Sequence, residues 1–131
     1  MDLRATLTAE FARRRRLNPR FSLRAFARAL GTHHRTLSQI LEGRRRLTTR
    51  AIRRLGAGLR LAPEQVAEAC LTEQCAAVLR FVGRPGFRPD ARWIAVMTGI
   101  PLDAVSVALH RLLHDRRLEM RSATHWITRG E

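Results

Sequence analysis

The sequence predicts a mainly α-helical protein that ends in a short pair of strands. Apolar residues recur every three or four positions through most of the 131 residues, which is the spacing of one face of an α-helix. Residues that favour helix ends punctuate this pattern at regular intervals. Only residues 118–121 and 124–128, on either side of Ser122-Ala123, read as β-strands.

Five helices are expected in the first half of the chain. They run from about Leu3 to residue 17, over 23–30, over about 33–41, from 49 onward with Ile52, Leu55 and Leu59 on one face, and from Pro63. Each is bounded by residues that suit a helix end. These are Ser22 and Thr48 as N-caps, Gly31 and Gly43 after C-termini, Asn18-Pro19 as a stop and Pro63 in a first turn.

The composition changes near residue 70, where we expect a boundary between domains 1–70 and 71–131. A further helix is predicted over 76–81, ended by the breaker cluster Gly83-Arg84-Pro85-Gly86. Two more helices are predicted over 90–98 and 102–114, before the strand pair. Helices followed by a two-stranded wing are the order of a winged-helix domain, which we therefore expect for residues 71–131.

Positive charge is concentrated in the first half. The sequence holds 25 basic residues other than His against 11 acids, and every one of the 25 is Arg. Residues 1–68 contain 16 Arg and 5 acids, whereas residues 69–131 contain 9 Arg and 6 acids. This excess predicts a polyanionic partner for the first half. A basic amphipathic membrane binder would need a Trp- or Leu-rich stripe, and the first half contains no Trp.

Other classes of protein are disfavoured. The N-terminus lacks a signal peptide's apolar block, so a cytoplasmic, nucleoid-associated protein is expected. No glycine loop suited to phosphates and no nucleophile paired with a base is present, so we expect neither an enzyme nor a cofactor. His110 and His114 lie one helical turn apart without a third ligand at metal spacing, so no metal site is expected. Cys70 and Cys75 are expected to be buried and reduced.

The segment 22–47 carries the spacing of a DNA-reading helix-turn-helix. Two helices that cross steeply over a tight turn need a small residue where they meet, which is Ala27. They need a residue free to adopt positive φ four positions later, which is Gly31. They also need apolar residues six and nine positions beyond the glycine, and Leu37 and Ile40 stand there.

Residues 20–68 resemble the lambda-repressor/Cro-type family, also called the xenobiotic-response-element type. The resemblance implies a helical bundle whose helix at 33–41 lies in the major groove. By position it implies base contacts from His33, His34, Arg35, Ser38 and Gln39. It implies phosphate contacts from Ser22, Thr36, Arg44, Arg45 and Arg46. The chemistry agrees, because Arg suits a guanine edge and Gln suits an adenine edge, and guanidinium groups suit phosphate oxygens. Arg13–Arg16 either steer DNA or only solvate the end of the first helix.

The second half repeats the spacing of the first. Ala95, Gly99, Val105 and Ala108 stand four, six and three apart, as do the four scaffold residues of the first half. The whole chain resembles a bacterial regulator family that couples a repressor-like helix-turn-helix to a C-terminal winged helix, most clearly at PRFSLRAFARALG and FRPDARWIAVMTGIPLDAVSVALHRLL. A second DNA contact is expected from Ser106, His110, Arg116, Arg117 and Arg121. The alternative is that this half only packs or dimerises.

The sequence thus predicts a sequence-specific double-stranded DNA-binding transcription regulator, repressor-like and homodimeric, without a membrane partner. Two alternatives stay open. An antitoxin-like protein-interaction module would expose an apolar patch on its C-terminal half. An architectural or RNA-binding protein would bind by charge alone, uniformly across sequences and with a strong salt dependence.

Overall fold

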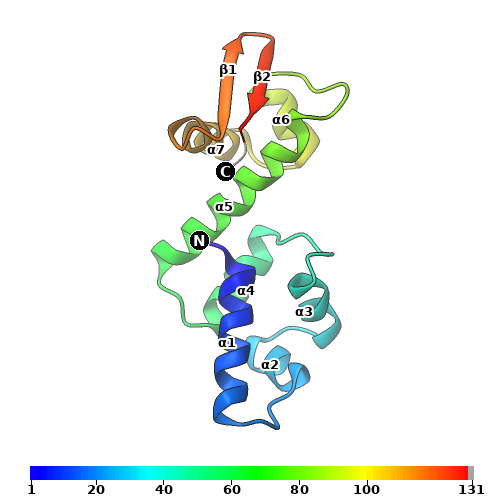
Figure 1. Cartoon of the computed structure of the whole chain (residues 1–131), viewed down its shortest axis with the longest axis vertical. Helices are drawn as coiled ribbons and strands as arrows, with labels where there is room; N and C mark the ends of the chain where they lie inside the picture. The colour runs from blue at the N-terminus through cyan, green and yellow to red at the C-terminus, as the bar shows by residue number, and fades with distance from the viewer. Residues whose placement is uncertain (130–131) are drawn as a thin grey trace. The chain divides into compact units, whose positions relative to one another are not determined.

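The computed structural model describes residues 1–129, and within them it contains seven helices and one two-stranded antiparallel sheet (Figure 1). The mainly helical fold class is thereby confirmed. The elements are α1 (Leu3–Leu17), α2 (Leu23–Leu30), α3 (His34–Leu41), α4 (Thr49–Gly58), α5 (Pro63–Val82), α6 (Ala91–Thr98), α7 (Leu102–His114), β1 (Leu118–Ser122) and β2 (His125–Thr128). The chain forms two compact units, Met1–Cys70 and Leu71–Glu131, and each is described by itself.

Side-chain caps fix the starts of most helices. The side chains of Asp2, Ser22, Thr48 and Asp90 each accept a hydrogen bond from a backbone N–H in the first turn of α1, α2, α4 and α6, respectively. Such caps satisfy donors that have no partner inside the helix. Two of these residues, Ser22 and Thr48, were predicted as caps from the sequence, and both predictions are confirmed.

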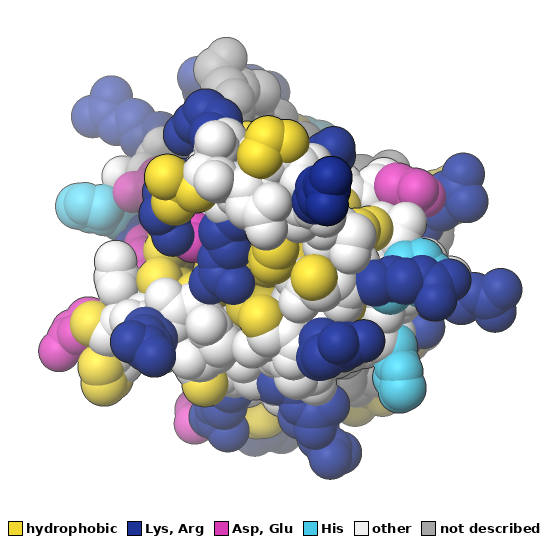
Figure 2. All heavy atoms as spheres, turned by 90° about the horizontal axis from the view of Figure 1, so that it is seen from below, with side chains coloured by type: hydrophobic (Ala, Val, Ile, Leu, Met, Phe, Trp, Pro, Cys, Tyr) yellow, Lys and Arg dark blue, Asp and Glu magenta, His cyan; other side chains and the backbone are white. Residues whose placement is uncertain are grey.

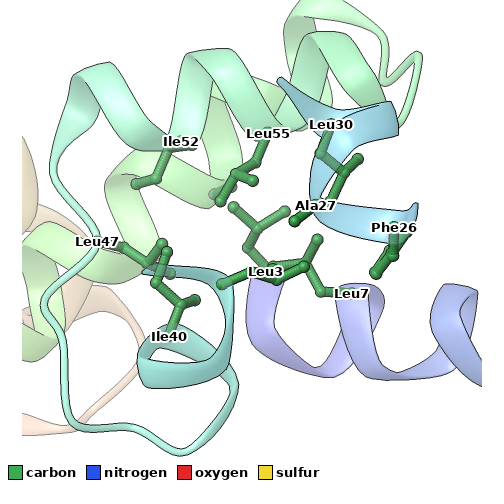
Figure 3. Packing of buried hydrophobic residues seen from close by; sticks show 11 residues of the cluster. Leu3, Leu7, Phe26, Ala27, Leu30, Ile40, Leu47, Ile52 and Leu55 are labelled. Atoms are coloured by element: carbon green, nitrogen blue, oxygen red, sulfur yellow. The ribbon is translucent and has the colours of Figure 1, made fainter. Parts of the chain in front are cut away.

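The core of the first unit is built from α1 to α4, the loop before α4 and Ala69 of α5. Figure 3 shows Leu3 and Leu7 of α1, Phe26, Ala27 and Leu30 of α2, Ile40 of α3, Leu47 of the loop, and Ile52 and Leu55 of α4 converging on one cluster. Phe11 stacks on Phe26 with ring centroids 5.4 Å apart, which joins the far end of α1 to α2. Burial of these apolar side chains is the main force that holds α2 and α3 in place.

The second unit has its own core, formed by α6, α7, β1 and the later turns of α5. Its buried members include Val78, Ile94, Val105 and Leu112. Strand β1 pairs with β2 in an antiparallel register that is irregular between Met120 and Ser122. The two strands form a hairpin directly after α7, as the sequence predicted.

One predicted element is wrong. The sequence predicted a helix from Pro63 and a separate helix at 76–81, but the structure has a single 20-residue helix, α5. The change in composition near residue 70 is real, yet no Gly or Pro lies between Pro63 and Gly83 to interrupt the helix. Cys70 and Cys75 of this helix form no disulfide; Cys75 is buried, as expected, but Cys70 is only half-buried. Burial raises the pKa of the Cys70 thiol.

Candidate nucleic-acid interface

Helices α2 and α3 form a helix-turn-helix in the first unit. Three residues separate the helices, and the first of them, Gly31, has φ +73° in the left-handed region. The N–H of Thr32 donates to the carbonyl of Ala27 at 2.9 Å, so the turn closes back on α2. Ala27, Leu37 and Ile40 are all buried. The four residues whose spacing predicted this unit therefore occupy the turn and the inner faces of the two helices.

The side of α3 opposite to these buried residues carries the predicted base-contacting side chains. His33, His34 and Arg35 are exposed, and Ser38 and Gln39 are half-buried. His33 is the N-cap residue of α3 and not its first helical residue, and its imidazole makes no capping hydrogen bond. Within residues 1–129 the guanidinium of Arg35 makes no hydrogen bond or ion pair, so its donors point to solvent. The structure thus brings the five residues together on one accessible face.

Two of these five side chains already have partners on the protein. The hydroxyl of Ser38 lies 3.2 Å from Oε1 of Glu42, and Nε of Arg45 donates to Oε1 of Gln39 at 3.0 Å. Glu42 also pairs with Arg44, at 3.2 Å. Sequence reasoning missed Glu42, although its position four residues after Ser38 on a helix predicts such a contact.

A second missed residue is Arg4 of α1. Its Nε donates to the carbonyl of Ile40 at 3.2 Å, and its Nη2 donates to the carbonyl of Arg45 at 3.0 Å. Cations at a helix C-terminus satisfy carbonyls that have no helical partner and interact favourably with the helix dipole. No local signal could have revealed this contact, because Arg4 lies 36 residues before Ile40 in the sequence.

The predicted phosphate-contacting residues have different surroundings. Arg44, Arg45 and Arg46 are exposed in the loop after α3, and the side chain of Arg44 is 78% exposed. Thr36 is half-buried, and the hydroxyl of Ser22 accepts a hydrogen bond from the N–H of Ala25. Ser22 therefore has a structural role whether or not it meets a phosphate.

Arginine dominates the charge of the visible surface. Figure 2 shows dark blue side chains spread over one face and acidic side chains at only a few isolated places. Not all of these arginines are available to a ligand. Arg13 and Arg14 both bind Glu10, at 2.6 and 2.9 Å, and these hydrogen bonds lower the pKa of Glu10 to about 2. Arg14 also lies over the ring of Phe26, so it stabilises the first unit itself.

Helices α6 and α7 of the second unit form another helix-turn-helix. The two axes are bent by 113° across a three-residue turn, within the 90–120° typical of this motif. Gly99 at the start of the turn has φ +75°, close to that of Gly31. Val105 and Ala108 are fully buried, and Ala95 is half-buried. The repeated spacing in the sequence therefore corresponds to a repeated arrangement in space.

The outward face of this second pair differs from that of the first. Of the seven large hydrophobic side chains found exposed in the described part of the chain, six lie in the second unit, and Val96, Met97, Leu102 and Val107 belong to α6 and α7. The hydroxyl of Ser106 donates to the carbonyl of Leu102 at 3.1 Å, and His110 is exposed. Along α7 one acid, Asp103, offsets one arginine, Arg111, whereas α3 contains Arg35 and no acid, so α7 has less net positive charge than α3.

The three arginines predicted to contact DNA near the strand pair differ in exposure and in their ion pairs. Arg116 is exposed and adopts φ +58°, whereas Arg117 is half-buried. Arg121 is exposed and lies 3.5 Å from Glu119, which also pairs with Arg129. The hydrogen bond from Arg129 lowers the pKa of the Glu119 carboxyl. The β1–β2 hairpin therefore presents arginines whose charge is partly balanced by one carboxylate.

Among residues 1–129, no three His, Cys, Asp or Glu side chains come together in a way that would hold a metal ion. Over the same residues, no individual helix has the length and hydrophobicity that a membrane span requires; only the bent pair α6–α7 meets these criteria, by composition.

Comparison with known proteins gives one match. Residues 8–69, just under half of the chain, match the family model of a helix-turn-helix domain. The match spans most of α1, all of α2 to α4 and the start of α5. No curated protein and no solved structure matches the chain. The first unit thus contains a helix-turn-helix domain, a type of domain found in DNA-binding regulators.

Proposed function

We propose that the protein is a sequence-specific double-stranded DNA-binding transcription regulator of the repressor-like type, with no enzymatic activity. The observation that carries the proposal is the accessible face of α3. It combines an unengaged guanidinium at Arg35, the amide of Gln39 and two histidines, and the arginine-rich loop follows directly. A helix of this kind fits the major groove, whose base edges present distinct patterns of donors and acceptors.

The contacts divide into two classes. His33, His34, Arg35, Ser38 and Gln39 are the residues proposed to meet base edges. Arg44, Arg45 and Arg46, with Thr36 and Ser22 near the helix starts, are proposed to contact phosphates. Base contacts specify sequence, whereas phosphate contacts supply affinity and register.

A single helix-turn-helix makes few base contacts, so we propose that the protein binds as a homodimer. Two copies would place their α3 helices about 34 Å apart on a palindrome. The second unit, which we interpret as a winged helix, would then either add DNA contacts through Ser106, His110, Arg116, Arg117 and Arg121 or provide contacts between copies.

The experiment that tests the proposal is selection of bound sequences from a random duplex pool, followed by titrations on the selected site and on random DNA at matched salt. A regulator is expected to prefer its site by about 10³-fold or more. Arg35→Ala is expected to weaken binding to the selected site by about 1–3 kcal/mol and to spare random DNA. Arg44→Ala removes the same charge and serves as the control, because removal of a phosphate ligand weakens binding to both.

Equal losses on both DNAs for Arg35→Ala would remove that residue from sequence readout. Selection of no motif would favour the architectural alternative, in which charge alone drives binding. A palindromic motif would indicate a homodimer. A direct tandem motif would indicate that one chain uses both of its helix-turn-helix units, and the absence of a motif would indicate architectural binding.

A second candidate function is a protein-interaction module, and the exposed apolar side chains of α6 and α7 favour it. Val96 is 81% exposed and Val107 is 54% exposed. Exposed apolar surface of this kind marks interaction sites when it is contiguous. Val107→Asp is expected to abolish association with another copy or another protein in sedimentation experiments while leaving random-DNA binding by the first unit intact.

A further inference from the structure

The turn that ends α3 folds back onto Gln39. Gly43 adopts φ +75°, and the N–H groups of Arg44 and Arg45 both donate to the carbonyl of Gln39, at 2.9 and 3.3 Å. The side chain of Arg45 then returns to the same residue, with its Nε 3.0 Å from Oε1 of Gln39. Arg45 is therefore bound to Gln39 through both its backbone and its side chain.

Arg4 of α1 fixes this turn from the other side. Its guanidinium donates to the carbonyl of Ile40 in the last turn of α3 and to the carbonyl of Arg45 in the loop. A single planar group thus ties the end of the helix to the loop that follows it. The backbone of Arg45 is consequently held at both ends, so its side chain starts from a defined point beside Gln39.

The contact decides which way the Gln39 amide faces. A guanidinium has only donors, so it takes the amide oxygen and leaves the NH₂ group directed elsewhere. Hydrogen bonds from a charged donor are stronger than those between neutral groups. An amide oriented in this way presents donors to DNA, whereas the bidentate pairing of glutamine with adenine uses the amide oxygen as well.

We propose that Arg45 is a positioning residue that sets the base preference of Gln39. With its oxygen held by Arg45, Gln39 presents NH₂ donors and selects a base with acceptors on its major-groove edge. Guanine offers two, N7 and O6, whereas adenine offers N7 beside an amino donor. The adenine preference expected for an unrestrained glutamine is thereby replaced by a preference for guanine. This inference rests on the proposed function, because it assumes that α3 reads base edges.

The test compares selections from a random duplex pool for the wild-type protein and four variants. Gln39→Ala identifies the base position that Gln39 reads, because the preference there disappears. The wild type is expected to take guanine at that position. In Arg45→Ala the guanine-to-adenine ratio is expected to fall about tenfold or more, and Arg45→Lys is expected to retain guanine because an ammonium also only donates.

Arg44→Ala is the matched control, because it removes the same charge from the neighbouring residue. It is expected to lower affinity while the guanine-to-adenine ratio stays within about twofold of the wild type. A merely structural role for Arg45 would loosen the preference at every position read by α3 and would not shift one position from guanine to adenine. The circular dichroism spectrum and thermal melt of each variant, measured in parallel, show whether it is folded.

Two results would overturn the inference while leaving the proposed function standing. One is a wild-type motif with adenine at the Gln39 position, and the other is an unchanged guanine-to-adenine ratio in Arg45→Ala. Absence of any motif for the wild type would overturn the proposed function itself, and this inference with it.

Discussion

Gly58, the last residue of α4, lies against α2 so closely that a methyl group has no room there. A Cβ placed on Gly58 would lie 2.9 Å from Cα of Leu30 and 2.9 Å from its Cδ2, well inside ordinary van der Waals contact. The obstructing Cα belongs to the backbone of α2, so no side-chain rotation relieves the clash. The expected effect of Gly58→Ala is therefore a displacement of α4 from α2.

Two opposing effects determine how much Gly58→Ala changes the free energy of unfolding. Alanine is favoured over glycine within a helix by up to about 1 kcal/mol, which alone would stabilise the variant. Forcing an extra methyl group into a packed interior costs about 1–3 kcal/mol. The packing term dominates because backbone must move, so we expect Gly58→Ala to lower the free energy of unfolding by about 1–2 kcal/mol. For a unit of this size each kcal/mol lowers Tm by about 4–8 °C.

The assay is unfolding of the full chain in urea, monitored by circular dichroism, and Gly83→Ala is the control. No atom lies within 4 Å of a Cβ at Gly83, and its backbone is not in the left-handed region. That variant is expected to be neutral or slightly stabilising. If Gly58→Ala unfolds at the same urea concentration as the wild type or at a higher one, the close approach of α4 to α2 is refuted.

Four further predictions concern the same unit. Replacing Arg44, Arg45 and Arg46 with glutamine is expected to make the dependence of the DNA association constant on salt less steep. The slope of its logarithm against log salt should decrease in magnitude by about 0.9 for each phosphate that the protein no longer neutralises. An unchanged slope in fluorescence titrations would exclude these arginines from phosphate binding. Leu37→Ala is expected to cost about 2–5 kcal/mol, because this side chain is fully buried, and a thermal melt indistinguishable from that of the wild type would contradict its place in the core. Gly31→Ala is expected to cost about 1–2 kcal/mol in denaturant unfolding, because φ is +73° there, and no decrease in stability would mean that the turn tolerates a side chain. The pKa of Glu10 is lowered to about 2 in the folded protein, so its ion pairs stabilise the protein above the ordinary pKa of 4.5, and this effect is lost as the pH falls through about 2. Glu10→Gln should therefore be less stable than the wild type by about 1 kcal/mol at pH 7, after allowance for solvent screening, and the difference should shrink as the pH falls below 4.5. A difference in stability that does not change with pH would contradict this.

Local signals in the sequence predicted most of the fold. Ser22 and Thr48 cap helices, and Gly31, Gly43 and Gly99 adopt positive φ, because these preferences act within a few residues of the chain. The continuity of α5 was not predicted, because the change in composition near residue 70 suggests a break although no residue there interrupts a helix.

The candidate site was predictable only in part. The outward position of Arg35 follows from the burial of Leu37 and Ile40 on the same helix, so periodicity is sufficient to predict it. The contact of Arg4 with the carbonyls of Ile40 and Arg45 depends on how α1 packs against α3, and no spacing in the sequence encodes that. The role of Arg45 beside Gln39 likewise emerges only from the geometry of the turn.

The two glycine turns, at Gly31 and Gly99, have a consequence for how such a protein can diversify. Both helix pairs are held by a few inward residues and one left-handed turn, while the outward positions carry arginine and glutamine in one copy and valine and leucine in the other. In each helix pair, the residues that would contact a partner are thus different from the residues that form the core and the turn. A substitution at an outward position can therefore change the kind of partner that the pair contacts while the inward residues and the glycine turn stay the same.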